Sequence, residues 1–342
     1  SDDTFSKLTG ISKADFRVLA KENFFDEANC SAAITEFMTR EESLANYCNL
    51  SAFQTIFDYI PPQRQYVFTP LLIVERMLDY LEAQRPDAFH SPDSTFLDLC
   101  SKGGIFSAAL AYRLFRNLRP SFSSDHDCLL HIFTHQIYAW SPDAVTHEVT
   151  LRTILSFTRF DEDVFSDSEL KEIMNHFVIY NPSDGKSVIN YVKVLQKNAE
   201  FWEDDVKFDI IIGNPPYQSG RRQVYADFYR MAADLDPELL CLIFPLGWQK
   251  VTNTNGLKQL NNIEYKRDPH LVLIDNYYEN DNRRIFPEIG TGGVNIVLRD
   301  NKYDNHGQIR KFEYGKEASS VVLPVETREV EKPAELDCLR NL

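Results

Sequence analysis

The sequence has few cysteines, and no two of them are spaced as Cys-x-x-Cys. Scattered cysteines predict free thiols in a reducing cytoplasm and argue against a disulfide-stapled secreted fold. The sequence also lacks a visible signal peptide and any apolar run near membrane-spanning length, so we expect no membrane partner. What it does have is 342 residues, 43% of them hydrophobic and 13% aromatic, enough to bury a large core.

Basic charge is scarce as well. Lys and Arg together number 36 against 51 Asp and Glu, which gives a net charge of −15 at pH 7. Proteins that bind nucleic acid gain most of their non-specific affinity from basic residues that neutralise phosphates. If this chain acts on nucleic acid, its basic residues must gather on one face, or another domain or subunit must hold the ligand.

The most informative segment is Asn214-Pro215-Pro216-Tyr217, which we call the Asn-Pro-Pro-Tyr turn. The apolar, β-branched run at 208–213 predicts a buried strand of a parallel sheet, and two prolines then end its pairing. Ligands of open α/β sheets bind at the carboxyl ends of strands. Asn214 and Pro215 offer two oxygen acceptors there and Tyr217 a flat ring, which suits a planar group with an exocyclic NH2. A strand end with Tyr217 packed on the core is the plainer alternative.

This turn, with the strand before it, resembles the catalytic motif of amino-methyltransferases, and most of all that of DNA adenine-N6 methylases from bacterial restriction-modification systems. The resemblance implies an α/β fold, a Rossmann-like methyltransferase sheet with helices on both faces, and S-adenosylmethionine as cofactor. It implies catalytic roles for Asn214, Pro215, Pro216 and Tyr217. Methylation of RNA or of a protein glutamine, and a catalytically silent subunit of a defence complex, are the alternatives.

Two segments ahead of the turn match the family's cofactor elements. Thr69 and Pro70 predict the N-cap and first residue of a helix over 71–81. A strand at 94–100, a loop at 101–104 and a helix at 105–118 form a unit that brings a nucleotide-like cofactor near backbone amides, although any strand-to-helix turn has this pattern. The resemblance implies cofactor contacts from Phe68, Thr69, Pro70, Asp98, Ser101, Gly103 and Gly104. Three positions depart from the family pattern, which has Pro in place of Leu99, Gly in place of Lys102 and Ser in place of Gly103.

The next cofactor contacts are less well matched. The family has an Asp near Ser141, after a strand predicted at 136–140, to bind the ribose; here Ser141 or the nearby Asp143 would do so. After a short strand predicted at 176–180, Asn181 and Asp184 are candidates for the adenine ring of the cofactor, but a simple turn explains them equally well.

His126, Cys128, His131 and His135 have types and spacings that zinc accepts. We interpret them instead as half-buried residues of a helix, because no second cluster supports a metal, and we predict no metal site. No constellation of paired carboxylates with Lys indicates a nuclease.

The resemblance runs from about residue 66 to 298, with its motifs in order. We predict a helical N-terminal extension over 1–62, a methyltransferase domain over 63–312 and a C-terminal tail over 313–342. In this motif order the DNA-reading domain follows the catalytic motif, and the tail is too short for one. The expected partner is double-stranded DNA, held through a recognition domain or subunit outside this chain.

Overall fold

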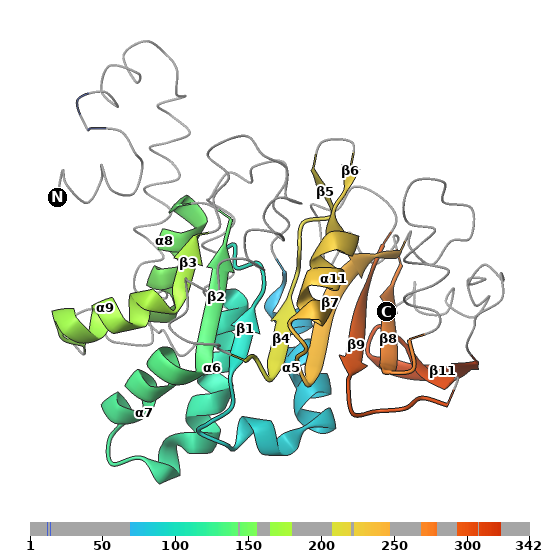
Figure 1. Ribbon diagram of the computed structural model, residues 1–342, viewed down its shortest axis with the longest axis horizontal. Coiled ribbons are helices and arrows are strands. Elements are labelled where there is room, and N and C mark those ends of the chain that lie inside the picture. Colours follow the sequence, from blue (N-terminus) through green and yellow to red (C-terminus); the bar gives the residue numbers. More distant parts are fainter. Residues whose placement is uncertain are drawn as a thin grey trace, which may run out of the picture.

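A computed structural model describes most of the predicted methyltransferase domain (Figure 1). The described residues are 69–142, 144–155, 165–179, 207–219, 222–246, 268–278, 293–306 and 308–322, together with Ser12 and Ala14. The predicted extension over 1–62 therefore lies outside them except at those two positions.

The described strands form a nine-stranded sheet in the order β11-β10-β8-β9-β7-β4-β1-β2-β3. Strands β3, β2, β1, β4 and β7 are parallel neighbours, and β9 runs antiparallel between β7 and β8. Their bounds are β1 Phe96–Asp98, β2 Ile137–Ser141, β3 Phe177–Ile179, β4 Ile210–Gly213, β7 Leu239–Pro245, β8 Leu271–Tyr277, β9 Val294–Asp300, β10 Gln308–Glu313 and β11 Lys316–Val322. A separate hairpin of β5 (Gln218–Ser219) and β6 (Arg222–Gln223) follows the Asn-Pro-Pro-Tyr turn.

Helices cover both faces of the sheet (Figure 1). Side chains of α5 (Leu71–Gln84) and α6 (Ile105–Leu118) pack with Phe96 and Ile210 in one buried cluster. Side chains of α11 (Tyr225–Asp234) pack with Leu97 and Ile211 in the other, because successive strand residues point to opposite faces. The other helical elements are η1 Pro86–Phe89, η2 Arg119–Ser121, α7 Asp125–His131, the π-helix η3 Ile132–Gln136, α8 Ala144–Leu155 and α9 Asp167–Asn175.

The start of α5 differs from its prediction. Pro70, with φ −59° and ψ 142°, is the N-cap, and no side chain caps this helix. The prediction that Thr69 caps the helix and Pro70 is its first residue is wrong by one position. The Thr69 hydroxyl is thereby left for a partner elsewhere in the fold.

The order in which strands are added to the sheet reverses at β1: β2 and β3 extend the sheet on one side of it, and β4 is then added on the other side. Strand β1 pairs with β2 on one side and with β4 on the other, with Asp98 opposite Ala139 and Ile212. A ligand crevice forms at such a switch point, beyond the carboxyl ends of the strands. The β5–β6 hairpin stands at this end of the sheet, at the top of Figure 1.

The sheet also continues beyond the predicted boundary at residue 312, because β11 pairs with β10 over Lys316–Val322. The boundaries of the three predicted segments stay a prediction.

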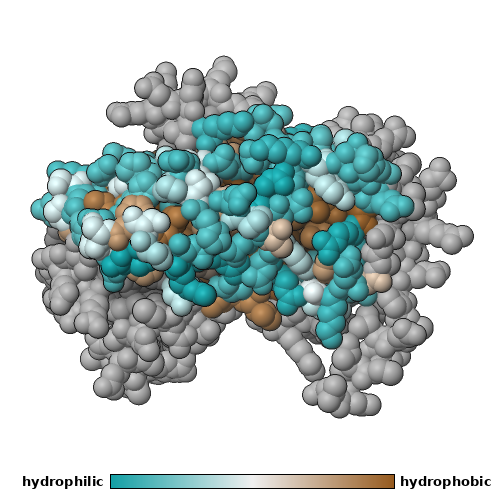
Figure 2. Space-filling view, turned by 90° about the horizontal axis from the view of Figure 1, so that it is seen from below, coloured by the Kyte–Doolittle hydropathy of each residue, from teal (hydrophilic) through white to brown (hydrophobic). Residues whose placement is uncertain are grey.

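Figure 2 views the molecule from below the orientation of Figure 1. On this face hydrophilic residues cover most of the described surface, and hydrophobic residues lie in separate patches.

Candidate active site

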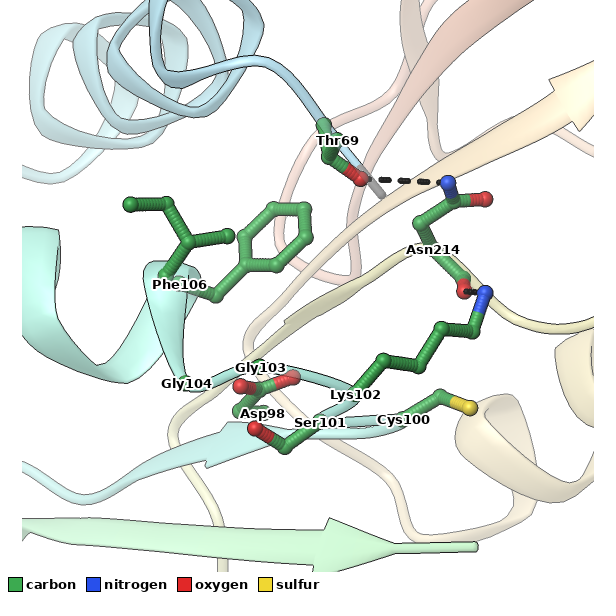
Figure 3. Close-up of a pocket in the computed structure, with 10 residues that line it drawn as sticks. Thr69, Asp98, Cys100, Ser101, Lys102, Gly103, Gly104, Phe106 and Asn214 are labelled. Atoms are coloured by element: carbon green, nitrogen blue, oxygen red, sulfur yellow. Dashed lines mark hydrogen bonds between the residues drawn. The ribbon is translucent and has the colours of Figure 1, made fainter. Parts of the chain in front are cut away.

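A pocket opens at the switch point, between the end of β4, the start of α5 and the loop from β1 to α6 (Figure 3). We call that loop, residues 99–104, the glycine loop. The pocket is lined by Thr69, Asp98, Cys100, Ser101, Lys102, Gly103, Gly104, Ile105, Phe106 and Asn214. The structure thus brings together the predicted catalytic residue Asn214 and five of the predicted cofactor residues. Cys100, Lys102, Ile105 and Phe106 were not predicted as site residues.

Asn214 follows directly on β4 and is only 2% exposed. Its side-chain Nδ2 donates a hydrogen bond to Thr69 Oγ1 over 3.1 Å, which fixes the orientation of the amide (Figure 3). Its Oδ1 is buried and has no hydrogen-bond partner among the described residues. Burying an unpaired amide oxygen costs free energy, so such an atom suggests a missing donor. Asn214, a residue of the pocket lining, therefore holds one oriented acceptor that lacks a partner among the described residues.

The rest of the Asn-Pro-Pro-Tyr turn lies just outside the pocket lining. Pro215 is buried, whereas Pro216 and Tyr217 are half-buried. The Tyr217 ring packs beside both core clusters, as in the plainer interpretation of the sequence, and its carbonyl accepts from Val224 N over 3.1 Å. Burial raises the pKa of the Tyr217 phenol, and the nearby Asn214 side chain opposes that rise. The hydroxyl itself is buried and makes no hydrogen bond with a described residue.

Asp98 ends β1 on the other side of the pocket and is 1% exposed. Its Oδ2 accepts from Ser107 Oγ over 3.0 Å, and its Oδ1 has no partner among the described residues. Burial raises the pKa of Asp98 to about 6, while hydrogen bonds from Ser101, Ser107 and the Cys100 backbone, with the Lys102 charge, oppose the rise. The pocket thus holds a second oriented acceptor that carries negative charge at neutral pH.

The glycine loop is fixed from two sides. Ser101 N donates to Trp140 O over 2.7 Å, and the Ser101 and Thr150 hydroxyls are 3.0 Å apart. Gly104, which precedes α6, has φ 74°, and a Cβ there would lie 3.0 Å from Thr150 backbone atoms of α8. Only glycine meets both conditions without strain. Glycine at this position therefore lets the loop pack closely against α8.

Two other predicted cofactor residues, Ser141 and Pro70, are described by the structure but are not in the pocket lining. Ser141 is fully buried at the end of β2, and its hydroxyl has no partner among the described residues. Pro70 is the N-cap of α5. Phe68, Asp143, Asn181 and Asp184 lie outside the described residues.

Two of the four residues whose spacing zinc would accept, His126 and His131, contact protein oxygen atoms in this structure. His131 Nε2 lies 2.9 Å from Pro92 O, and His126 Nε2 lies 3.2 Å from a Glu169 oxygen. Within the described part of the chain, no three His, Cys, Asp or Glu side chains are grouped as metal ligands. Over the same ranges, no helix combines the length and apolar character of a membrane span.

The sequence is similar to those of known methylases. Residues 135–281, less than half of the chain, match the Eco57I restriction-modification methylase family, and this segment includes β2, β4 and the Asn-Pro-Pro-Tyr turn. An uncharacterised adenine-specific methylase of Mycoplasma pneumoniae is 24% identical over 289 residues, covering 69% of this chain and 67% of that protein. The predicted family resemblance is confirmed. The chain is similar to restriction-modification methylases over 135–281 and to an adenine-specific methylase over most of its length.

Solved structures of methylases have the same fold. The methyltransferase subunit of a type I restriction-modification system from Streptococcus thermophilus matches 87% of this chain with a TM-score of 0.52 at 10% identity. The DNA-bound, ATP-dependent Type ISP restriction-modification enzyme LlaBIII matches 90% of it, also with 0.52, at 14% identity. This chain spans 57% of the first and 26% of the second. The predicted methyltransferase sheet, with helices on both faces, is confirmed.

Proposed function

We propose that this chain transfers the methyl group of S-adenosylmethionine to the N6 amino group of adenine in DNA. The observation that carries the proposal is the Asn214 side chain at the end of β4. Its amide nitrogen is held by Thr69 and its oxygen is a buried acceptor without a partner among the described residues. An exocyclic NH2 group supplies the donor that this oxygen lacks.

The turn orients the target amine. Asn214 Oδ1 and the Pro215 carbonyl would accept the two amino hydrogens, which draws the nitrogen lone pair out of conjugation with the ring and points it at the methyl donor. The adenine would leave the DNA stack to reach them, and Tyr217 would stack on its face. For that contact Tyr217 must present the part of its ring that the core clusters leave exposed.

The chemistry of the pocket lining supports the proposed cofactor. Among the described residues, Asp98 Oδ1 is a buried acceptor without a partner, which a cofactor hydroxyl or ammonium group would supply, and Gly103 and Gly104 line the pocket beside it. Ile105 and Phe106 give the pocket an apolar side. S-adenosylmethionine, when bound there, supplies an electrophilic methyl group next to Asn214. No metal and no covalent intermediate with the protein are needed for the transfer.

DNA binding requires basic surface that this chain has in short supply, given its net charge of −15. We therefore propose that double-stranded DNA is held mainly by a recognition domain or subunit outside this chain. LlaBIII, which shares the fold, was solved bound to DNA, and this chain spans only 26% of it. The cytoplasmic location stays a prediction.

The decisive experiment compares Asn214→Ala with the wild-type chain. S-adenosylmethionine with a labelled methyl group is supplied with adenine-unmethylated genomic DNA, and N6-methyladenine is quantified by mass spectrometry. We expect the variant to lose transfer by about 100-fold or more, because it removes an acceptor used in the transition state. Cofactor affinity, measured by calorimetry, should stay close to that of wild type. Asn175→Ala, at an exposed position ending α9, is the matched control.

Near-normal methylation by Asn214→Ala would overturn the assignment. Parallel assays on RNA and on glutamine peptides separate the two other methyl-transfer functions, since only the true substrate should depend on Asn214. A wild-type chain that binds no S-adenosylmethionine would favour the silent-subunit alternative.

A further inference from the structure

Lys102 is the most unusual residue of the pocket. It belongs to the glycine loop, where the related family has glycine, and it is only 7% exposed. Its Nζ donates a hydrogen bond to the backbone carbonyl oxygen of Asn214 over 3.1 Å (Figure 3). Burying an ammonium group costs free energy unless it is paired, and the Lys102 charge also opposes the rise that burial causes in the pKa of Asp98. A buried cation at this position calls for a functional explanation.

The hydrogen bond joins two parts of the site that are distant in sequence. Lys102 follows β1 and Asn214 follows β4, 112 residues later. The accepting carbonyl belongs to the peptide unit between Asn214 and Pro215. Because a peptide unit is planar, holding its carbonyl oxygen also fixes the orientation of the Pro215 nitrogen, from which the chain continues.

The prolines transmit this constraint to the next oxygen. The ring of Pro215 fixes its φ, and Pro216 restricts the ψ of Pro215 to extended values. Once the Asn214 carbonyl is held, little freedom remains for the direction of the Pro215 carbonyl. The proposed function makes that carbonyl the second acceptor of the target amine.

We propose that Lys102 is a positioning residue that holds the Asn-Pro-Pro-Tyr turn against the glycine loop, so that both amine acceptors stand at a fixed distance from the methyl donor. The inference rests on the proposed function for its catalytic consequence, but the tether itself is a property of the free protein. Lys102 acts through the turn and touches neither reacting atom.

Electrostatics separates this role from cofactor binding. The methyl donor carries a sulfonium cation, and an ammonium group in the same pocket repels it. Removing the Lys102 charge should therefore leave S-adenosylmethionine affinity unchanged or make it tighter. A residue that bound the cofactor through its carboxylate would have the opposite effect.

The test uses Lys102→Met, which keeps the length and apolar stem of the side chain but removes the donor. In single-turnover reactions at saturating S-adenosylmethionine, we expect the methyl-transfer rate to fall about 10-fold or more, with no weakening of the cofactor Kd. Lys102→Arg, which retains a charged donor, should recover at least part of the rate. Lys171→Met, on exposed α9, is the matched control and should change neither quantity.

Hydrogen–deuterium exchange of the free protein tests the tether without the reaction. We expect faster exchange in the peptide that carries Tyr217 and the β5–β6 hairpin for Lys102→Met, and wild-type exchange for Lys171→Met. Lys102→Leu, which also removes the donor, replaces the Met variant if the latter does not fold.

If Lys102→Met exchanges at the wild-type rate in the Tyr217 peptide, Lys102 does not hold the Asn-Pro-Pro-Tyr turn and the proposal is overturned. A weaker affinity for S-adenosylmethionine with an intact transfer rate would also overturn it. Faster exchange in a chain whose wild type transfers no methyl group would overturn the proposed function and leave the tether standing.

Discussion

Two buried aspartates at opposite parts of the sheet show the difference between a structural and a ligand-binding carboxylate. Asp275 in β8 is fully buried, and both of its oxygens are paired. Oδ2 accepts from Tyr80 OH over 2.9 Å and from Tyr277 OH over 2.8 Å, while Oδ1 accepts from Gly315 N over 3.0 Å. The carboxylate thereby joins α5, β8 and the turn between β10 and β11.

Asp98 in β1 is buried to the same degree, but one of its oxygens has no partner among the described residues. Burial raises the pKa of both groups. At Asp275 hydrogen bonds to both oxygens offset part of the cost of burial. At Asp98 the Oδ1 atom has no such compensation until a bound ligand donates a hydrogen bond to it. Burial alone therefore does not identify a site; incomplete pairing of a buried group that lines a pocket does.

The largest effect should come from breaking the fully paired carboxylate. Asp275→Ala would leave the buried Tyr277 hydroxyl, the half-buried Tyr80 hydroxyl and the Gly315 N–H without their acceptor. We expect the free energy of unfolding to fall by about 3–5 kcal/mol, measured by urea denaturation. Tyr80→Phe, which removes one of the three hydrogen bonds, should cost about 1 kcal/mol. If Asp275→Ala weakened cofactor binding without loss of stability, the structural role of Asp275 would be refuted.

The Asp98 carboxylate should behave in the opposite way. Its pKa of about 6 when folded exceeds its usual 3.8, so the folded state binds the proton more tightly than the unfolded state. Stability is then lost as pH rises from about 4 to 6 and stays lower above that range, by about 3 kcal/mol. Asp98→Asn removes this penalty and should stabilise the free protein at pH 8, with little effect at pH 4.

Urea denaturation at the two pH values measures that difference, and Asp93→Asn, at an exposed position, serves as the control. The same Asp98 variant should bind S-adenosylmethionine at least 10-fold more weakly, because a neutral amide replaces the free acceptor. Lower stability of Asp98→Asn at pH 8 would contradict the contrast with Asp275.

Most of the fold could be predicted from local sequence pattern. The helix at 105–118 has the predicted bounds and β4 lies within the run predicted at 208–213, because a helical period of apolar residues and a continuous β-branched run are local signals. The turn after β4 could also be predicted, since two prolines end a strand whatever surrounds them. The catalytic roles assigned to residues 214–217 stay a prediction.

Contacts between distant segments could not be read from local pattern. Asn214 is held by Thr69, 145 residues away, and by Lys102, 112 residues away. Nothing near Lys102 in the sequence indicates that its side chain reaches the end of another strand. It was recognised only as a departure from the family pattern, and that departure was the available signal.

The smallest of these effects is expected at Thr69. Its hydroxyl pairs with Asn214 Nδ2, whereas Asn214 Oδ1 has no partner among the described residues, so one side chain contains both a paired and an unpaired group. Thr69→Val keeps the shape of the side chain but removes the acceptor of Asn214 Nδ2. We expect a loss of about 1 kcal/mol in unfolding free energy and a transfer rate reduced about fivefold, since the Asn214 amide would no longer be held in one orientation. Thr69→Ser should retain wild-type behaviour. Calorimetry with S-adenosylmethionine separates this role from the predicted cofactor contact: an unchanged Kd assigns Thr69 to Asn214, whereas a weakened Kd with a normal rate at saturating cofactor assigns it to the cofactor.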